Sequence, residues 1–406
     1  MTIRHHLEQC LALTLMFAYP STRASAQSSV TGTHFVVTER ARINPDAADV
    51  RASLSFVGGA TMMRNGTLLV SQPMEKLVRV FDSTGHFQRS LGRSGKGPNE
   101  FESIQGLGRV GDTAYVIDHR NRRITFFPNA ETSNLSLRLP LAQLRGAEYS
   151  GPLALLANGA AVTNSVTASA AEGSVQTLYL HNRDGTDLIK LIALKDNDYS
   201  TPLKFGAIKL PFPQPLVVSP RVLYSPVSGR VALLTTTFPE KSGTASLQII
   251  WMDKTGRKDE QTISTPASVV RASDIDSLLD MFSKSIAPLL RASGAIVTVE
   301  SLREATAKVL VKRKYFPIVE RVFMDDDGRA WVKIRNESEW LIFTHGSRRV
   351  DGVILPSNAS PLSASGSKLW VQSVDADDLP SLIRYEIKNA MPRVKTRVVD
   401  TPWVPQ

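Results

Sequence analysis

The most motif-like arrangement of chemically useful residues is the segment "SLGRSGKGPNEF", which runs from Ser90 to Phe101. A phosphate-binding loop needs Gly-Lys followed by Ser or Thr, but Gly97 follows Lys96, and Ser90 holds the position of the first required glycine. A nucleophile elbow needs Gly-x-Ser-x-Gly, and Lys96 stands where its last glycine is required. The segment therefore predicts a glycine-rich connection between strands, with Phe101 packed between neighbouring sheets.

The elements around this segment repeat along the chain. An apolar stretch, a tight glycine turn and a second apolar, β-rich stretch recur at six places, as in "MMRNGTLLVS" and "MDDDGRAWVKI". Glycine accepts the positive φ angle that such hairpin turns impose. The turn glycines are Gly66, Gly111, Gly159, Gly229, Gly328 and Gly366. A second turn follows most of these, so each unit predicts a four-stranded antiparallel sheet.

Six such units in series predict an all-β protein, a six-bladed β-propeller with four-stranded antiparallel blades. One blade has two apolar faces, and stacking in a closed ring buries both against its neighbours. The strand "HFVVTERARI", at 34–43, is expected to pair with the last blade, and the final segment "PRVKTRVVD" competes for the same outer position.

The stretch 58–127 resembles an NHL repeat. The matching residues are Gly95, Gly97, Phe101, Asp118, Asn121, Arg123, Ile124 and Phe127. The later units follow the strand rhythm without the residue motif. The resemblance implies an exported propeller related to NHL proteins, in which Asp118, Asn121 and Arg123 bond loops to neighbouring backbone.

Two segments interrupt the rhythm. "NDYSTPLKFGAIKLPFPQP" is rich in proline and predicts an extended loop. The residues "ASDIDSLLDMFSKSIAPLLRASG" and "TVESLREATAKVLVKRK" carry apolar side chains at steps of three and four, which is typical of amphipathic helices. Ser273 is the expected N-cap of the first helix and Gly294 its end. We therefore predict a two-helix insertion at about 270–315, between blades four and five, which serves either as packing or as a lid or partner platform.

The first residues predict an exported protein. A weakly basic start, the apolar run "LALTLMFAY" and the small residues before Gln27 are typical of a secretory signal at 1–26, cut after Ala26. The remaining residues, 27–406, then form a single propeller domain without a membrane span, either periplasmic or secreted. The only cysteine, Cys10, lies in the leader, so disulfides and thiol catalysis are excluded from the exported chain.

Propellers bind ligands at the mouth of the central channel, so the loops that follow each second strand hold the candidate ligand-binding residues. These residues are Gln72, Glu75, Asp118, His119, Arg120, Glu240, Arg335, Asn336 and Asp375. Glu240, Asn336 and Asp375 could bind calcium, because hard cations take oxygen ligands from separate loops. No catalytic residue can be assigned, since the many serines and seven histidines define no triad.

Two functional hypotheses stay open. The first is a binding or scaffold module that engages a protein, a glycan or a small ligand at the channel mouth, without a cofactor. The alternative is a calcium-dependent hydrolase or lyase of the gluconolactonase-like or amidating-lyase-like type. The net charge of +10 would suit nucleic acid, but the basic residues are scattered and export argues against that partner. We expect a monomer.

Overall fold

The computed structural model describes residues 32–44, 49–131, 136–137, 149–157, 160–169, 173–182, 189–195, 200–205, 208–238, 243–252, 258–292, 295–375 and 379–392. The predicted signal and its cleavage after Ala26 lie outside these residues, as does Glu240.

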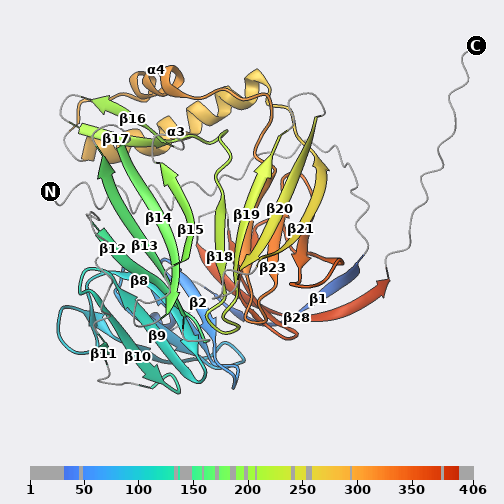
Figure 1. Cartoon of the computed structure of the whole chain (residues 1–406). Helices are drawn as coiled ribbons and strands as arrows, with labels where there is room; N and C mark the ends of the chain where they lie inside the picture. Colours follow the sequence, from blue (N-terminus) through green and yellow to red (C-terminus); the bar gives the residue numbers. More distant parts are fainter. Residues whose placement is uncertain are drawn as a thin grey trace, which may run out of the picture.

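Most of the described chain folds into antiparallel sheets of four strands that follow one another in sequence, so the described residues are all-β with two α-helices (Figure 1). The first sheet contains β2 (Gly59–Met62), β3 (Leu68–Gln72), β4 (Leu77–Phe81) and β5 (Phe87–Leu91). The second contains β8 (Ile104–Val110), β9 (Thr113–Asp118), β10 (Arg123–Pro128) and β11 (Ser136–Leu137). The third contains β12 (Tyr149–Leu155), β13 (Ala160–Ser169), β14 (Gly173–Asn182) and β15 (Ile189–Lys195), and the fourth contains β18 (Arg221–Tyr224), β19 (Val231–Thr237), β20 (Thr244–Met252) and β21 (Lys258–Pro266).

An eight-stranded sheet joins the first described strand to the last seven strands. Its strands in sequence are β1 (Thr33–Ile43), β22 (Val319–Met324), β23 (Ala330–Ile334), β24 (Glu339–Phe343), β25 (Val350–Ile354), β26 (Ala359–Ser365), β27 (Lys368–Val374) and β28 (Pro380–Pro392). β1 pairs antiparallel with β28, with Val37 opposite Ile387, and parallel with β25, with His34 opposite Gly352. The predicted pairing of 34–43 with the last unit is confirmed, while the competing segment beyond residue 392 lies outside the described residues.

Apolar clusters join each sheet to its neighbour. Phe101 is fully buried and meets Phe127 at 6.3 Å between ring centroids, in a cluster shared by the β2–β5 and β8–β11 sheets. Trp370 of β27 and Leu68 of β3 share another cluster, which joins the last strands to the first sheet. Each fully buried large side chain contributes about 1.5–3 kcal/mol, so these contacts hold the sheets together face to face.

The opening glycine-rich segment is confirmed as a strand connection. It contains β6 (Arg93–Ser94) and β7 (Glu100–Phe101), two short strands that pair parallel to each other. Gly92 has φ +79°, and a Cβ atom there would lie 2.2 Å from the Phe101 ring. Glycine is required at this position because the buried ring occupies the space of any side chain.

The proline-rich stretch is not the extended loop that its composition predicted. It forms a hairpin of β16 (Ser200–Phe205) and β17 (Ile208–Pro213), with Leu203 opposite Leu210. The hairpin is stable because Leu203 and Phe212 are buried in one cluster with residues of the helices. Composition alone gave no sign of this, since the partner surface is supplied by a segment about seventy residues further along the chain.

The two predicted helices are present, as α3 (Ala272–Ala292) and α4 (Val299–Val309), between β21 and β22 in chain order. The expectation that Ser273 caps α3 is wrong, because Ser273 lies inside the helix. Instead, Asp274 accepts a hydrogen bond from the Arg271 backbone N–H at 2.7 Å, which satisfies one donor at the helix start. The expected end at Gly294 lies outside the described residues. Both described helices are too short or too polar to cross a lipid bilayer.

Candidate functional site

The hairpin and the helices lie at one end of the sheets, which we call the mouth end. In an antiparallel sheet, alternate connections lie at the same end, so the turns from second to third strands share an end with the segments that lead to the next sheet. The hairpin follows β15 and the helices follow β21, and both therefore belong to this end. Figure 1 shows α3, α4, β16 and β17 above the ends of β13, β14, β19 and β20.

The hairpin and the helices form a single structure, which we call the cap. The Phe212 ring packs against Phe282 of α3 at 4.8 Å between centroids. Gln214, just after the hairpin, donates to the Val309 carbonyl at 2.9 Å and accepts from the Val311 backbone N–H at 2.8 Å. Two insertions from different places in the chain thus share one apolar core and one hydrogen-bonding side chain.

The cap is tied to the sheets by two antiparallel segments beside α3 and β22. The Val270 N–H donates to the Lys314 carbonyl, and the Phe316 N–H donates to the Ser268 carbonyl, both at 2.9 Å. Phe316 is buried with Leu216 and Leu278, one from each insertion. These contacts fix the position of the cap over the mouth end.

Arg335 and Asn336, two predicted ligand-binding residues, support this connection. The Arg335 guanidinium lies 4.9 Å from the Phe316 ring centroid, and its Nε donates to the Pro317 carbonyl at 3.1 Å. Asn336 donates from Nδ2 to the Ser268 hydroxyl at 2.7 Å. Both side chains therefore lie at the mouth end and hold the base of the cap.

Asp118 has the structural surroundings that the NHL resemblance implied. It is fully buried, and its carboxylate accepts from the backbone N–H groups of Glu102, Ser103 and Asn121 at 2.9, 3.2 and 3.1 Å. The Asn121 side-chain amide donates a fourth bond at 2.7 Å. This carboxylate fixes the segment that enters β8, and its lone pairs are occupied by these donors.

Gln72 fulfils the same task in the first sheet. Its Oε1 accepts from the backbone N–H groups of Ser55 and Phe56 at 3.1 and 3.2 Å. Glu75, in the following turn, accepts from the Ser55 hydroxyl and from Arg79, both at 2.6 Å. These two predicted ligand-binding residues lie together in one network at the mouth end.

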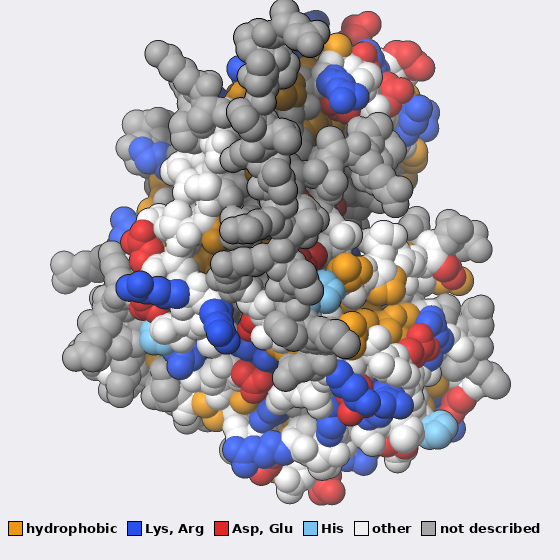
Figure 2. Space-filling view, turned by 90° about the vertical axis from the view of Figure 1, so that its right-hand side faces the viewer, with side chains coloured by type: hydrophobic (Ala, Val, Ile, Leu, Met, Phe, Trp, Pro, Cys, Tyr) orange, Lys and Arg blue, Asp and Glu red, His pale blue; other side chains and the backbone are white. Residues whose placement is uncertain are grey.

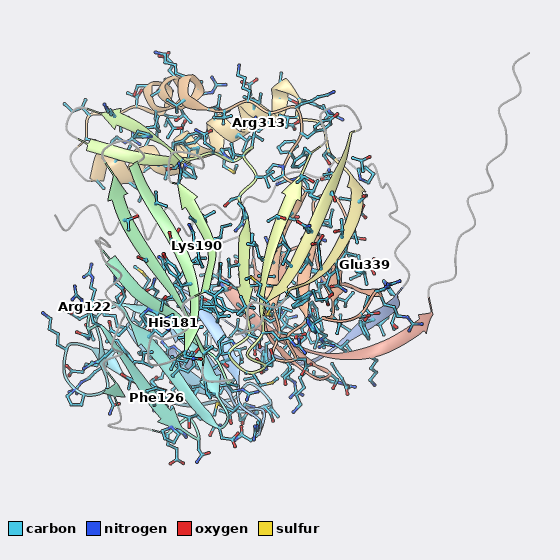
Figure 3. All side chains as sticks on the ribbon, viewed as in Figure 1. Arg122, Phe126, His181, Lys190, Arg313 and Glu339 are labelled. Carbon is cyan, nitrogen blue, oxygen red and sulfur yellow. The ribbon has the colours of Figure 1, made fainter. Side chains whose placement is uncertain are left out.

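The remaining candidates are exposed or partly exposed. His119 Nδ1 lies 2.9 Å from Gln105 Oε1, and Arg120 is exposed. Asp375 accepts from the Leu379 backbone N–H at 2.9 Å and so closes its own turn. His181 was not among the predicted ligand-binding residues, and Figure 3 shows it in the strands, well below the cap.

The three calcium candidates do not form a described cluster. Asn336 is bonded to the base of the cap, Asp375 closes a turn, and Glu240 lies outside the described residues. Within the described ranges, no group of three or more His, Cys, Asp or Glu side chains has the arrangement of a metal site.

Sequence reasoning missed Arg221, the first residue of β18. Its side chain is exposed, yet nearby protein atoms desolvate it and lower the pKa of its guanidinium. The signal that could have found it is a positive charge at the start of a strand whose other residues, Val222, Leu223 and Tyr224, are apolar or aromatic.

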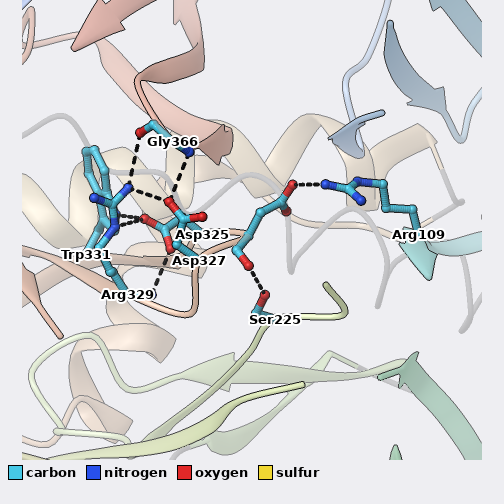
Figure 4. Close-up of polar contacts among 8 residues, drawn as sticks. Arg109, Ser225, Asp325, Asp327, Arg329, Trp331 and Gly366 are labelled. Atoms are coloured by element: carbon cyan, nitrogen blue, oxygen red, sulfur yellow. Dashed lines mark hydrogen bonds and ion pairs between the residues drawn. The ribbon is translucent and has the colours of Figure 1, made fainter. Parts of the chain in front are cut away.

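The opposite end of the sheets carries a network between turns, drawn in Figure 4. Arg109 of β8 donates to the Asp326 carboxylate at 2.9 Å, and the Ser225 hydroxyl donates to the Asp326 carbonyl at 3.4 Å. The Asp326 N–H donates to the Ala364 carbonyl at 2.9 Å. Burial raises the pKa of Asp326 to about 6, although the Arg109 charge opposes the shift. Turns from four sequence units thus meet and close this end.

Neighbouring Asp325 is buried and accepts from Arg329 Nε at 2.6 Å and from the Trp331 indole N–H at 2.8 Å. Burial raises its pKa as well, against the opposing charge of Arg329. This residue stabilises the turn that presents Asp326.

Comparison with known proteins leaves the family open. No family model matches the chain, and no curated protein matches its sequence. Among solved structures, it is similar to a protein described as exported from Bacteroides fragilis, with 10% identity, 90% of this chain and 98% of the other covered, and a TM-score of 0.44. It is also similar to a member of the duf4221 family from Bacteroides vulgatus, with 9% identity, coverage of 89% and 100%, and a TM-score of 0.47.

A third similar structure is virginiamycin B lyase from Staphylococcus aureus, with 10% identity, coverage of 89% and 90%, and a TM-score of 0.34. At these identities and TM-scores, the likenesses imply no activity for this chain.

Proposed function

We propose that the chain is an exported six-bladed β-propeller that acts as a binding module, with its ligand received at the mouth end beneath the cap. The four separate sheets and the two halves of the eight-stranded sheet supply the six blades, and the shared cluster of Trp370 and Leu68 supports closure of the ring. The helices are then an insertion between the fourth and fifth blades.

The observation that carries the proposal is the shared core of the cap. Two insertions that packed only on their own blades would not need to contact each other. Here the Phe212 ring packs against Phe282, and the Gln214 side chain bonds both the Val309 carbonyl and the Val311 N–H. A rigid structure built over the end at which loops from several blades converge favours a covered binding site.

The closed end supports the same choice of face. There, Arg109, Ser225, Asp326 and Ala364 use their polar groups on one another, so the turns are joined and offer little to a ligand. The mouth end is where the chain has added residues beyond the blade pattern.

The alternative, a calcium-dependent hydrolase or lyase, would take oxygen ligands from Glu240, Asn336 and Asp375. Asn336 and Asp375 make separate local contacts, with Ser268 and with the Leu379 backbone, and within the described ranges no group of His, Cys, Asp or Glu side chains has the arrangement of a metal site. We therefore prefer the binding role.

Hydrogen exchange tests the proposal on the mature chain, residues 27–406, with a panel of peptides and neutral and acidic oligosaccharides. A bound probe should slow exchange at 119–121, 335–337 and α3, and leave the turn at 325–328 unchanged. Protection confined to that turn, or no binding by any probe in the panel, would overturn it. N-terminal sequencing of the exported protein should begin at Gln27, and retention of Met1 would contradict the predicted export signal.

A further inference from the structure

A short basic segment connects α4 with β22. Residues 308–315 contain four Lys or Arg and no Asp or Glu. Leu310 and Phe316 are both 7% exposed, and each belongs to an apolar cluster of the cap. The four residues at 311–314 are all exposed, and we call them the basic strap. An extended segment lying on an apolar surface would bury alternate residues, so the strap presents both of its faces to solvent.

Hydrogen bonds at both ends fix the strap in position. Gln214 Oε1 accepts from the Val311 N–H at 2.8 Å, and the Lys314 carbonyl accepts from the Val270 N–H at 2.9 Å. Figure 3 shows Arg313, in the middle of the strap, at the level of the helices. The cations of the strap are therefore held on an ordered backbone at the base of the cap, which lowers the entropy cost of binding a partner.

A fourth cation lies beside the strap. Val269 forms an antiparallel bridge with Tyr315, and this register places Arg271 opposite Arg313. Like charges at opposite positions of an antiparallel pair are destabilising. Together with the two lysines that flank Arg313, these side chains form a group of four exposed cations on two adjacent segments. A bound anion would relieve their repulsion.

The acidic residues of α3 make other contacts. Asp276 and Asp280 both pair with Arg303 of α4 at 2.7 Å, and Asp274 accepts from the Arg271 backbone N–H. Figure 2 shows cations and anions interspersed over the lower surface in that view, without a large patch of one sign. The strap differs from this pattern, because it places three cations at consecutive positions and so creates a local positive potential.

Two aromatic rings adjoin the strap. Tyr315 and Phe238 are half-buried, and their rings are nearly parallel, with 7° between the planes and 6.4 Å between the centroids. The Lys314 ammonium lies 5.2 Å from the Tyr315 ring centroid. Phe238 directly follows β19, the second strand of its sheet, so the ring pair belongs to the mouth end. This surface therefore combines a row of cations with partly exposed aromatic rings.

We propose that the basic strap and the Tyr315–Phe238 pair bind an acidic polysaccharide, which carries carboxylates or sulfates along its chain. The inference rests on the proposed function and adds the chemical class of the ligand. Anions repeated along a polymer match cations at consecutive positions of an extended segment, and aromatic rings pack against the C–H faces of sugar rings.

Two other anionic partners match this surface less completely. An anionic lipid surface would require a broad apolar face to insert, whereas the large apolar side chains exposed here are Val269 and Val311. An acidic peptide would satisfy the cations and leave the aromatic rings unused. Both partners are therefore included in the test as competitors.

Matched polymers test the role of charge. Calorimetry measures binding to the mature chain at several salt concentrations, with polygalacturonate and its methyl ester as one pair and dextran sulfate and dextran as the other. We expect at least one acidic polymer to bind, its neutral counterpart not to bind, and the affinity to fall as salt rises. The tighter acidic polymer separates a carboxylate ligand from a sulfate ligand. Binding of neither acidic polymer, or equal binding of a neutral counterpart, would overturn the inference.

Poly-glutamate and phosphatidylglycerol vesicles represent the competing partners. If either binds more tightly than both acidic polysaccharides, the surface recognises an acidic peptide or a lipid, and the inference is wrong. Tyr315→Leu should weaken binding of the acidic polysaccharide without changing its salt dependence, and should leave poly-glutamate binding unchanged. Unchanged polysaccharide binding by this variant would remove the aromatic pair from the site.

A triple variant tests the strap itself. Lys312→Gln, Arg313→Gln and Lys314→Gln together should weaken binding of the acidic polysaccharide by about tenfold or more and make its salt dependence shallower, because fewer charges are engaged. The substituted side chains are exposed, so the variant should melt at the wild-type temperature. Loss of binding is then not loss of folding.

A second triple variant is the matched control. Arg64→Gln, Arg348→Gln and Arg349→Gln remove three exposed charges from turns at the opposite end of the sheets, and this variant should bind like the wild type. If the strap variant binds as tightly as this control, the strap is not the site, whereas mouth-end protection by another probe would keep the binding module. If an acidic polysaccharide binds through the strap and slows hydrogen exchange only at 311–316, the strap is a separate glycan site and the covered site fails.

Discussion

Arg109 and Asp326 are separated by 217 residues in sequence, and they form an ion pair at 2.9 Å between side chains that are 4% and 13% exposed. Arg109 also donates to the Met62 and Gly111 carbonyls at 2.6 and 3.0 Å. One guanidinium thus joins the turns of the first two sheets to the turn between β22 and β23. The protonation of this one partly buried carboxyl group should therefore affect the stability of the fold.

The stability of the protein should therefore carry a pH dependence from Asp326. Its pKa rises from 3.8 in the unfolded chain to about 6 in the fold. At pH values between these two, the folded protein therefore binds a proton that the unfolded chain does not bind. Stability from this group increases as pH falls from about 6 towards 4 and is constant above about 7. Relative to Asp326→Asn, the wild type should gain about 2 kcal/mol in unfolding free energy between pH 7.5 and pH 4.5.

Urea denaturation at four pH values between 4.5 and 7.5 measures this difference. Asp112→Asn is the control, since Asp112 is an exposed carboxylate 3.5 Å from Arg64. A constant difference between the wild type and Asp326→Asn over this range would show that Asp326 has an ordinary pKa.

Loss of the Asp118 carboxylate should destabilise the fold. Asp118→Ala leaves the backbone N–H groups of Glu102 and Ser103 and the Asn121 amide without an acceptor in a buried place. Each unsatisfied donor costs about 1–3 kcal/mol, so we expect a loss of at least about 3 kcal/mol in unfolding free energy by urea denaturation. A loss below about 1 kcal/mol would indicate that Asp118 is free for a ligand instead.

The repeat rhythm could be read from the sequence because each turn glycine and each apolar alternation is a local signal. Gly66 and Gly328, for example, have φ +90° and +75° between first and second strands, as the hairpin pattern predicts. The cap core could not be read in this way. Leu203 and Phe212 belong to a short proline-rich segment, and their burial depends on helices that are distant in sequence.

The candidate site shows the same division. Arg335 and Asn336 lie between β23 and β24, in the loop after a second strand, and this position follows from strand order. The sequence could not reveal that both side chains bond the base of the cap, since Phe316 and Ser268 approach them only in three dimensions.

Pairing of β1 with β28 should control global stability. Val37 lies in the middle of β1, opposite Ile387, and proline at this position cannot donate a backbone hydrogen bond. Val37→Pro should lower the unfolding free energy by about 3 kcal/mol or more, measured by urea denaturation. Arg40 also lies on β1, and Arg40→Ala removes its exposed ion pair with Glu386 of β28. This variant should cost about 1 kcal/mol or less. Equal losses for the two variants would mean that β1 is dispensable for closure.

The shared core of the cap should make its two insertions unfold together. Phe212→Ala removes the ring that packs against Phe282, and such a truncation costs about 3–5 kcal/mol of local stability. Because both rings lie in one cluster with α4, we expect faster hydrogen exchange in β16, β17, α3 and α4, while the β2–β5 sheet stays protected. Leu289→Ala truncates an exposed residue of α3 and should leave exchange in the hairpin unchanged. If Phe212→Ala loosened the hairpin alone and left α3 protected, the two insertions would be independent, and the cap would not be the single structure on which the binding site depends.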